Sequence, residues 1–548
     1  MGEPKWHWVE RFPGMDTETD PLELGAKMMD GEGVMWTDDS LNGYGDGTYW
    51  QVRPGIRLGT GQGTTSTAIY DLVRLSLADP AYTGASADYL GTSVKDVLVG
   101  LSLLSSGDYI RVYSWDVGTL PAIGAGVIVG VGEADANREA RLVPAGASMA
   151  LIRTGGIGTG GQQLALQARV ASSGWFAPLP YTGPANPDGS PMAAALAVWH
   201  KEQIFLMKNK DPRYASRVLP SDRNKPTTYN VNNAFVVEED GTFMIQGAYS
   251  SKERLYIGRS GSLYMLTGAT VDKFRAQGIS TKYGVAGARG GDVIGPDTII
   301  AFLTESVKPS GGTREYPVPR NISLIAGGEL KVIGDRVLTA IRAGSDASRE
   351  TQVQAWTALR GALLIPKRVT TAAACDALFY STASGGFWQW TIGATIGACC
   401  LRETGGTMYL GTAGGGSNAG AIQYFDPTYA SDNGAAFTAR LSSPPYRSSE
   451  KKVIEEMIVV ASQTSGTAAN WTAQRRLPSG SYETAFSIVQ TGAPTMNGYP
   501  QAFRFKFPTL TSGQAKADYI NGWRINPPAD GVGCRIHAVG WTDKGAGG

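Results

Sequence analysis

The chain has 548 residues, which is too long for one ordinary hydrophobic core, so we expect two to four structural units. Apolar residues make up 42% of the chain, which excludes a disordered protein, and 72 Gly with only 18% charged residues favour tight turns and surfaces buried against other subunits. The 49 basic and 48 acidic side chains nearly cancel, which argues against a free-standing nucleic-acid binder.

The first 60 residues divide into two segments. Residues 1–35 are polar and interrupted by Pro and Gly, and they predict an extended N-terminal arm that packs on something else. In residues 36–60, Asp46-Gly47 is a favourable hairpin turn, and Arg53-Pro54-Gly55 ends a strand because Pro cannot donate to a ladder. We interpret residues 36–60 as the first strands of the propeller predicted below.

The spacing of apolar residues changes over residues 61–180. Apolar residues recur at near-helical spacing from Ala68 to Ala78 and from Ser93 to Leu104, whereas Tyr109 to Tyr113 and Gly126 to Val131 are typical of strands. This mixture predicts an inserted mixed α/β domain that follows the first propeller strands. The Pro-rich link from Pro178 to Pro191 closes it.

Residues 181–440 repeat one unit, in which an aromatic-rich strand, a Gly-containing turn and a second such strand follow one another. The unit occurs at Leu255 to Leu266, Asp376 to Trp390 and Met408 to Phe425, with a looser copy from Phe235 to Ile245. A lone hairpin must stack on neighbours to bury its face, so the recurrence predicts a β-propeller. At ~40 to 50 residues per blade the length predicts about six blades, with an N-terminal strand closing the ring.

A C-terminal β-domain is predicted over residues 441–548. Val453 to Ala461 and Gln501 to Phe507 are typical of longer strands. Alternation in the second strand predicts that one face carries Phe503, Phe505 and Phe507, while the other carries Arg504 and Lys506. The Gly-rich segment from Lys544 to Gly548 predicts a flexible end.

Several short sequence segments, which we call phrases, follow one another along the chain. They are Leu41-Asn42 with Gly47, Tyr49 and Val52-Arg53-Pro54-Gly55-Ile56; Leu255 to Leu266, Ile279 to Ala286 and Thr298 to Leu303; and Met408 to Phe425 with Ser431 to Phe437. Together they resemble the β-propeller proteins in the tails of short-tailed bacteriophages, the tail nozzle or packaged-DNA stabilisation group. The phrases are structural rather than catalytic, and the segment from Gly61 to Val170 has no counterpart among them.

The resemblance implies a structural virion protein without enzymatic activity, cofactor or metal. It implies a homo-oligomeric ring, a hexamer, at the distal end of the tail, whose channel retains the packaged genome until ejection. The implied partners are other copies of the chain, the tail adaptor or other tail proteins, tail fibres or spikes, and double-stranded DNA held non-specifically in the lumen. Such a protein is made in the bacterial host cytoplasm and ends in the virion.

Two other classes of function compete with the nozzle. One is a glycan-binding or glycan-cleaving tail spike, although the long β-helical or coiled-coil repeats through which spikes trimerise are not visible in the sequence. The other is a cellular propeller that serves as an interaction scaffold.

One motif and three histidines are candidates for a ligand site. Gly156 to Gly161 spells G-x-G-x-x-G, but a dinucleotide site needs a helix there and an acid about twenty residues on, where the chain instead has Tyr181 to Pro184. We therefore predict a flexible turn. His7, His200 and His537 are far apart in the sequence, and His200 lies in a predicted strand, which favours a structural role.

A propeller glycosidase would need two carboxylates that face each other across a sugar bond. Asp432-x-Gly434-x-x-Phe437 is close to an Asp-box turn, yet Ala430 stands where that turn has Ser. The run from Glu238 to Asp240 is typical of a solvated hairpin tip. We therefore assign no catalytic residue.

Basic residues gather in one stretch around Tyr214: Lys201, Lys208, Lys210, Arg213, Arg217, Arg223 and Lys225. They indicate an exposed loop or contacts with acidic neighbours, and the alternative is that copies around an axis combine them into phosphate contacts. The four cysteines, Cys375, Cys399, Cys400 and Cys534, have neither metal-ligand spacing nor a disulfide framework, so we predict reduced structural thiols. No run approaches the ~18 apolar residues of a membrane span.

Overall fold

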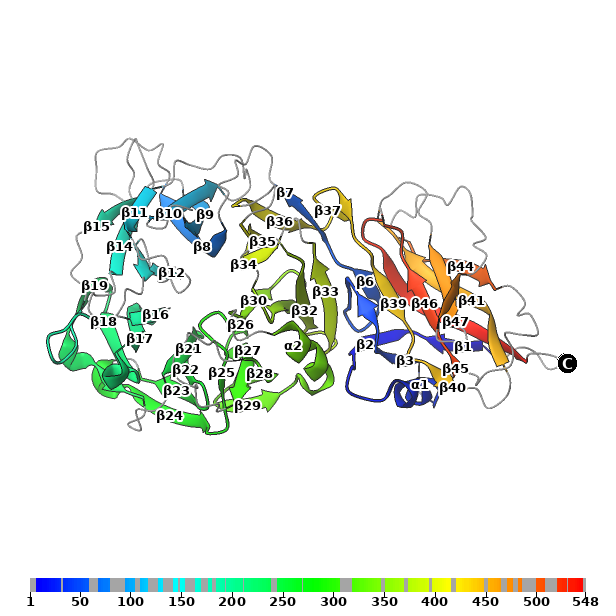
Figure 1. Cartoon of the computed structure of the whole chain (residues 1–548), viewed down its shortest axis with the longest axis horizontal. Coiled ribbons are helices and arrows are strands. Elements are labelled where there is room, and N and C mark those ends of the chain that lie inside the picture. Colours follow the sequence, from blue (N-terminus) through cyan, green and yellow to red (C-terminus); the bar gives the residue numbers. More distant parts are fainter. Residues whose placement is uncertain are drawn as a thin grey trace.

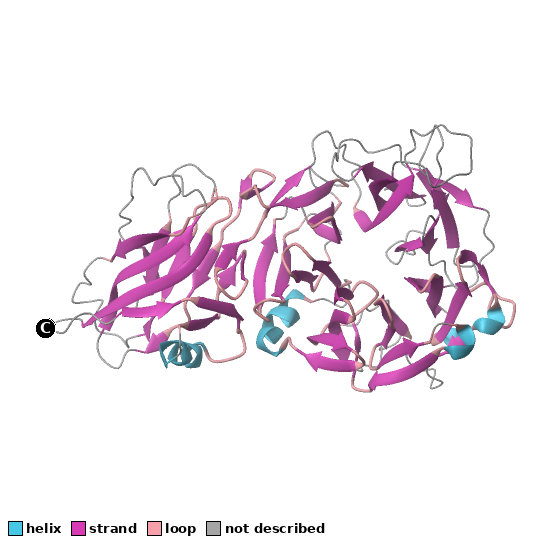
Figure 2. Cartoon of the chain, turned by 180° about the vertical axis from the view of Figure 1, so that it is seen from behind, coloured by secondary structure: helices cyan, strands magenta, loops and turns pink. Residues whose placement is uncertain are grey.

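The computed structural model consists of a ring of β-sheets and an adjoining β-domain (Figure 1). The view from behind shows that strands dominate both parts and that the few helices lie at their edges (Figure 2). The structure describes residues 6–30, 33–58, 68–78, 94–103, 109–116, 127–131, 141–145, 148–152, 163–168, 176–179, 184–192, 194–209, 211–237, 244–268, 270–305, 318–345, 350–368, 373–393, 397–414, 420–447, 452–464, 471–476, 481–484, 499–507, 520–529 and 531–545.

The ring begins with four antiparallel sheets, which we number as blades in chain order. Blade 1 is β8 (Ile69–Ala78), β9 (Val94–Leu103), β10 (Tyr109–Asp116) and β11 (Val127–Val131), and blade 2 is β12 (Arg141–Ala145), β13 (Ser148–Ile152), β14 (Gln163–Ala168) and β15 (Phe176–Leu179). Blade 3 is β16 (Ala194–His200), β17 (Gln203–Asn209), β18 (Arg217–Asp222) and β19 (Lys225–Tyr229), with β20 (Phe235–Val236) on β18. Blade 4 is β21 (Ile245–Ser250), β22 (Leu255–Arg259), β23 (Leu263–Thr267) and β24 (Arg275–Ser280).

Three further blades complete the ring. Blade 5 is β25 (Tyr283–Val285) and β26 (Gly291–Gly295), both paired with β27 (Thr298–Glu305), then β28 (Asn321–Ala326) and β29 (Glu329–Val332). Blade 6 is β30 (Gln352–Trp356), β31 (Gly361–Ile365), β32 (Cys375–Ser381) and β33 (Phe387–Ile392). Blade 7 is β34 (Ala398–Thr404), β35 (Thr407–Thr412), β36 (Ile422–Asp426) and β7 (Gly55–Leu58).

The chain is therefore a β-propeller, and the described residues form seven blades, one more than the predicted six. The innermost strands β8, β12, β16, β21, β26, β30 and β34 contact one another in turn, and β34 contacts β8 again. An N-terminal strand closes the ring as predicted, because β7 pairs antiparallel with β36, with Ile56 opposite Phe425. The predicted hairpins around Leu255, Asp376 and Met408 are confirmed as β22–β23, β32–β33 and β35–β36.

Hydrophobic clusters lie between neighbouring blades and hold them together. Phe205 of blade 3 and Ile257 of blade 4 belong to one cluster, and Tyr256 of blade 4 and Ile299 of blade 5 belong to the next. Blade 4 thus buries both of its faces. Short apolar and aromatic strands are suited to this position.

The prediction of an inserted mixed α/β domain over residues 61–180 is wrong. The described residues there are the strands of blades 1 and 2, and the two segments predicted as helices are β8 and β9. A register shift between Ile69 and Asp71 interrupts the alternation of β8. Moreover, Leu98 and Leu101 of β9 lie on opposite faces and both are buried, so the strand shows no simple period of two.

Two further predictions need correction. One is that residues 36–60 form the first strands of the propeller, and the other is that Phe235 to Ile245 form a hairpin. In residues 36–60, β7 belongs to blade 7 and β4 (Ser40–Leu41) adds to the sheet of blade 6. In contrast, β5 (Gly43–Gly45) and β6 (Trp50–Val52) pair with each other around the predicted Asp46-Gly47 turn and join the C-terminal domain. β20 and β21 do not form a hairpin with each other, since β20 pairs with β18 and β21 with β22. They end one blade and begin the next.

The C-terminal domain contains a sheet ordered β44 (Gln501–Lys506), β41 (Lys452–Ser462), β47 (Arg535–Gly545), β6 and β5, with β1 (Trp6–Val9) also paired to β47. Phe505 is buried and Arg504 is exposed, which confirms the predicted alternation. The predicted flexible end is wrong for Lys544 and Gly545, because both pair with β41. Ala546 to Gly548 lie outside the described residues.

One nine-stranded sheet passes from the propeller into the C-terminal domain. Its order is β30, β31, β32, β33, β4 (Ser40–Leu41), β39 (Arg440–Ser442), β46 (Trp523–Asn526), β42 (Thr472–Arg476) and β43 (Tyr482–Thr484). Leu41 makes the connection, because it pairs with Gln389 of blade 6 on one side and with Arg440 on the other. Figure 1 shows β33 and β39 on either side of this boundary.

The N-terminal arm is not extended throughout. It contains β1, β2 (Arg11–Met15), helix α1 (Pro21–Asp30) and β3 (Val34–Thr37), and β2 pairs parallel with β3. Phe12, Met15 and Met28 are buried in the large core shared by blades 5 to 7 and the C-terminal domain. The arm is thus an integral part of its own chain's core. A strand pair β40 (Tyr446–Arg447) and β45 (Ile520–Asn521) lies against α1.

Candidate functional site

Two of the phrases that carry the resemblance, Leu41 to Ile56 and Ser431 to Phe437, meet at one buried arginine between the propeller and the C-terminal domain. Arg53 follows β6, and its guanidinium forms a two-pronged ion pair with Asp432, with Nη1 to Oδ1 at 3.0 Å and Nη2 to Oδ2 at 2.7 Å. The side chains of Arg53 and Asp432 are 0% and 5% exposed. We call this the Arg53 clamp.

All five donors of the Arg53 guanidinium are used in the clamp. Besides Asp432, Nε donates to Asn42 Oδ1 at 3.0 Å, Nη1 to Pro54 O at 2.9 Å and Nη2 to Thr391 O at 2.9 Å. The ring of Phe437 covers the guanidinium at 3.9 Å. A buried charge needs such complete pairing, because unpaired burial costs several kcal/mol.

The clamp joins four segments that are distant in the sequence. Asn42 precedes β5, Thr391 belongs to β33 of blade 6, and Asp432 belongs to β37 (Ser431–Asp432), which pairs with β7 of blade 7. Asn42 also accepts from Thr391 N at 2.8 Å and donates to Thr438 O at 2.8 Å. The clamp therefore fixes the N-terminal strands, blades 6 and 7 and the exit from the propeller against one another.

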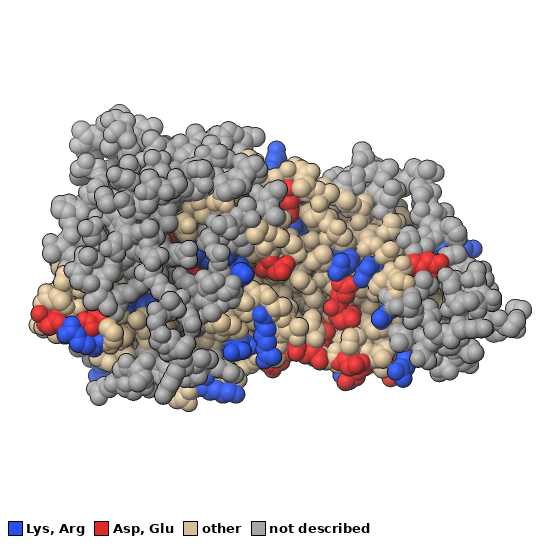
Figure 3. Space-filling view, viewed as in Figure 1, with Lys and Arg blue, Asp and Glu red and all other residues tan. Residues whose placement is uncertain are grey.

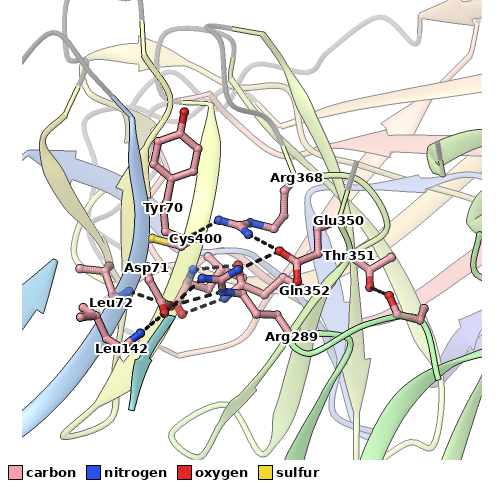
Figure 4. A network of polar contacts seen from close by, with 12 residues as sticks. Tyr70, Asp71, Leu72, Leu142, Arg289, Glu350, Thr351, Gln352, Arg368 and Cys400 are labelled. Atoms are coloured by element: carbon pink, nitrogen blue, oxygen red, sulfur yellow. Dashed lines mark hydrogen bonds and ion pairs between the residues drawn. The ribbon is translucent and has the colours of Figure 1, made fainter. Parts of the chain in front are cut away.

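A second charged network lies inside the ring (Figure 4). Asp71 of β8 accepts from Leu142 N of blade 2 at 2.9 Å, and Arg289 Nη2 lies 3.1 Å from Asp71 Oδ2. Arg289 precedes β26 of blade 5, which is not a neighbour of blade 1 in the ring. Asp71 thus links blades 1, 2 and 5.

Blade 6 completes this network with one acid and one base. Glu350 Oε2 accepts from Arg289 Nη1 at 2.8 Å and from Arg368 Nη1 at 2.6 Å, and Arg368 Nη2 donates to Tyr70 O of blade 1. Asp71, Arg289, Glu350 and Arg368 are all buried, and their two negative and two positive charges balance. We call these four side chains the ring network, which fastens blades 1 and 2 to blades 5 and 6.

The arm makes a third connection, to the segment between blades 5 and 6. Helix α2 (Leu338–Gly344) begins there, and Thr339 N donates to Glu18 Oε1 at 2.6 Å. Thr17 N donates to Arg336 O at 2.7 Å, and the Arg336 guanidinium lies 3.8 Å from the ring centre of Trp36. The bonds from α2 and Thr17 lower the pKa of the Glu18 carboxyl against the opposing effect of burial.

The structure separates the three histidines that the sequence offers as candidates. His200 is buried, and its Nδ1 lies 2.9 Å from Ser250 Oγ. Burial, helped by the neighbouring Lys201 charge, lowers the pKa of His200 to about 4, so the ring is neutral at pH 7 and has the predicted structural role. His537 Nε2 lies 2.8 Å from Ser462 Oγ, and His7 stacks on Trp541.

The other predicted features have different outcomes. Asp432, considered as a glycosidase carboxylate, is engaged in the Arg53 clamp and does not face a second carboxylate there. The G-x-G-x-x-G motif at Gly156 to Gly161 and the cluster from Glu238 to Asp240 lie outside the described residues. Cys375, Cys400 and Cys534 are buried and form no disulfide with one another, and the described residues contain no cluster of metal ligands.

The basic stretch lies on blade 3 beside acidic side chains. Arg213 pairs with Asp211 and Asp188, Arg223 pairs with Glu202, and Figure 3 shows blue and red atoms side by side at the corresponding edge of the ring. The interpretation as contacts with acidic neighbours is confirmed for these arginines. Lys210 lies outside the described residues.

Sequence reasoning missed the ring network and the role of Arg53. In the sequence, Arg53 stands out only because its neighbour Pro54 ends a strand. Asp71 stands alone in an apolar run, which is a usable signal for a buried, paired carboxylate. Arg289 and Glu350 have no such signal, because their contacts are set by the closure of the ring.

Comparisons with known proteins show similarity at the level of folded structures only. No protein-family model matches the chain, and no curated protein matches it. Among solved structures, the WD40 domain of Neurospora crassa Pan2 is 8% identical with a TM-score of 0.33, over 60% of this chain and 85% of that one. The WD40 domain of Toxoplasma gondii coronin is 9% identical with a TM-score of 0.34, over 68% and 87%.

A structure from a study of two prolyl endopeptidases is 10% identical with a TM-score of 0.32. That match covers 53% of this chain and only 38% of the peptidase chain. Scores and identities this low assign no activity. Within the described residues, no helix has the length and apolar character needed to cross a membrane.

Proposed function

We propose that the chain is a structural virion protein that forms the distal tail nozzle ring of a short-tailed phage and retains the packaged genome until ejection. One observation carries the proposal. Two phrases that resemble nozzle proteins, Leu41-Asn42 with Arg53-Pro54-Gly55 and the segment with Asp432 and Phe437, meet at the Arg53 clamp. The clamp makes this joint rigid, which supports the role of a subunit that resists the pressure of a packaged genome.

The connections between propeller and C-terminal domain support a steric gate. The nine-stranded sheet, the Arg53 clamp and the contact of the arm with α2 all cross this boundary. A subunit joined in this way moves as one body, so the bore of a ring would change by rotation at the contacts between subunits. Side chains or loops at the axis would narrow the bore before ejection.

The proposed partners follow from this role. Copies of the chain would form a hexamer, held by the tail adaptor or other tail proteins on one side and in contact with tail fibres or spikes. Double-stranded DNA in the lumen would be held non-specifically. The pairing of Arg213 and Arg223 with acids supports weak contact, because a channel that must release DNA cannot bind phosphates tightly.

The proposal is tested in phage particles. The chain should be found by mass spectrometry in purified virions, in about six copies per tail if the hexamer is correct. Particles assembled without it should lose packaged DNA and lack density at the tail tip in electron micrographs. Virions that contain no copy of the chain, or that retain their DNA without it, would overturn the proposal.

A further inference from the structure

The C-terminal sheet has an outward face that carries two tryptophans. Residues directly opposite one another in a ladder share a face, so Trp8 of β1, Gly540 of β47, Ile458 of β41 and Arg504 of β44 form one row across the sheet. The opposite face contains Trp541, which is 1% exposed. Trp8 is 41% exposed. The row therefore lies on the solvent side.

The Trp8 ring lies flat on this face. A Cβ placed on Gly540 would be 2.9 Å from each of three atoms of the six-membered ring of Trp8, namely Cε3, Cζ3 and Cη2. A point at equal distances from three atoms of a regular six-membered ring lies on the axis through the ring centre. The indole thus covers Gly540 face-on, and its other face is directed to solvent.

Trp6 packs against Trp8 on this face. It lies two residues before Trp8 and therefore on the same face of β1. The ring centroids are 6.0 Å apart and the ring planes differ by 28°. The two indoles are thus stacked on the same face of β1, and we call them the Trp6–Trp8 platform.

Polar groups lie on the same face at a fixed distance from the platform. Arg504 Nη2 and Glu456 Oε2 are 2.7 Å apart, and the Arg504 side chain is 60% exposed. β41 and β44 are two and three strands from β1, which places the pair about 10 to 15 Å from the platform. Arg504 offers exposed hydrogen-bond donors, the Glu456 side chain is 13% exposed, and the charges of the pair cancel.

We propose that the Trp6–Trp8 platform is a stacking site for a neutral oligosaccharide, with the Arg504–Glu456 pair contacting hydroxyl groups of a neighbouring sugar unit. A pyranose ring has an apolar C–H face that packs on a flat indole and hydroxyls at its edge. The exposed indole area can pack against the C–H face of a sugar, and the Arg504–Glu456 pair, whose charges cancel, can hydrogen-bond to its hydroxyls. The inference goes beyond the proposed nozzle function and does not depend on it.

Two other kinds of partner fit less well. An aromatic side chain has ~150 to 250 Å² of surface to bury, so Trp8 exposes about 100 Å², whereas a standard protein interface needs ~800 Å² on each partner. Single-stranded nucleic acid also stacks on aromatic rings, but it needs a cationic groove along its backbone. The pairing of Arg504 with Glu456 removes one of the cations that such a groove would use.

The test uses the purified full-length chain and four neutral hexamers: cellohexaose, maltohexaose, mannohexaose and chitohexaose. Binding is followed by tryptophan fluorescence and by saturation-transfer NMR. We expect at least one of them to bind, and we expect Trp8→Ala to weaken that binding at least tenfold. Gly540→Ala should weaken it similarly, because its Cβ would displace the ring. Trp8→Tyr should retain part of the affinity.

The matched control is Tyr499→Ala, which removes another aromatic side chain that is 76% exposed, and it should leave binding unchanged. Thermal melting identifies a variant that fails to fold. If Trp8→Ala does not fold, sugar binding by Gly540→Ala and Trp8→Tyr tests the proposal instead. Failure of all four hexamers to bind would overturn the proposal, as would binding that Trp8→Ala leaves unchanged. Binding of a dT20 oligonucleotide that depends on Trp8, with no sugar binding, would replace the sugar with single-stranded nucleic acid.

Discussion

Arg53 and Asp432 are 379 positions apart in the sequence, yet they form a two-pronged ion pair that is closed off from solvent. The pair joins the first strands of the chain to the exit from the last blade. A propeller must close its ring at some point, and here β7 closes it through the backbone while the Arg53 clamp fixes the joint through side chains. The same joint carries the C-terminal domain.

Removing one partner of the clamp should cost more than removing both. Arg53→Met leaves the Asp432 carboxylate buried and unpaired, so we expect the free energy of unfolding to fall by about 3 to 5 kcal/mol. The double variant Arg53→Met/Asp432→Leu should recover part of that loss. Urea unfolding measures both. Arg57→Met is the control, because Arg57 is 47% exposed and lies 3.5 Å from Asp426, and its loss should cost less than about 1 kcal/mol. Equal effects at the two arginines would contradict the clamp.

The ring network makes a similar prediction at a different place. Glu350→Gln removes the charge between Arg289 and Arg368 and leaves two buried guanidiniums with one carboxylate. We expect a loss of about 3 kcal/mol and faster amide exchange in β8 and β12, which the network fastens. Glu202→Gln, whose partner Arg223 is 65% exposed, is the control and should have little effect. Unchanged exchange in β8 would show that the network does not hold blade 1.

How much of the fold the sequence predicts depends on how local each feature is. The hairpin at Leu255 to Leu266 is predicted correctly because its two strands and turn are contiguous. Blade 1 is not, because β8 is buried on both sides and its register shift at Asp71 disturbs the alternation. The joint at Leu41, which belongs to a nine-stranded sheet, depends on residues near positions 389 and 440 and has no local signature.

The candidate site shows the same limit. The residues of the Arg53 clamp stand in the sequence as separate phrases, because nothing local indicates that Arg53 reaches Asp432. Trp6 and Trp8 lie in a segment that is polar overall, and the structure alone shows that both belong to the outward face of a strand. Composition excludes classes of function, but it does not bring these residues together.

Deletion of Met1 to Asp30 should damage the C-terminal domain. The sequence alone predicts that this truncation weakens assembly and leaves the propeller folded. Because Phe12, Met15 and Met28 are buried in the core, we also expect faster amide exchange in β47 and at the Arg53 clamp. Strands β21 to β24 of blade 4 should keep their protection and serve as the internal control. Normal protection of β47 in the truncated chain would contradict this account.

Acid should weaken the fold through His200. Its pKa is about 4 in the folded chain, against 6.5 as the ordinary value, so between these pH values only the unfolded chain binds the proton. The contribution of His200 is complete above pH 6.5 and is lost as the pH falls toward 4, where the loss reaches about 2 to 3 kcal/mol. Urea unfolding of wild type and His200→Gln at pH 7 and pH 4.5 measures this contribution as the difference between the two proteins in the pH dependence of the free energy of unfolding. Identical pH dependence in the two proteins would contradict the prediction.

The most direct test of the nozzle account is the oligomeric state of the purified full-length chain, by mass measurement together with class-averaged electron microscopy. Sugar binding at the Trp6–Trp8 platform is independent of this measurement, because that site lies within a single chain. The account predicts a closed ring of identical subunits, a hexamer, with an open axial channel formed between the subunits. A chain that stays monomeric at all concentrations, or that forms a trimer without a channel, would contradict it.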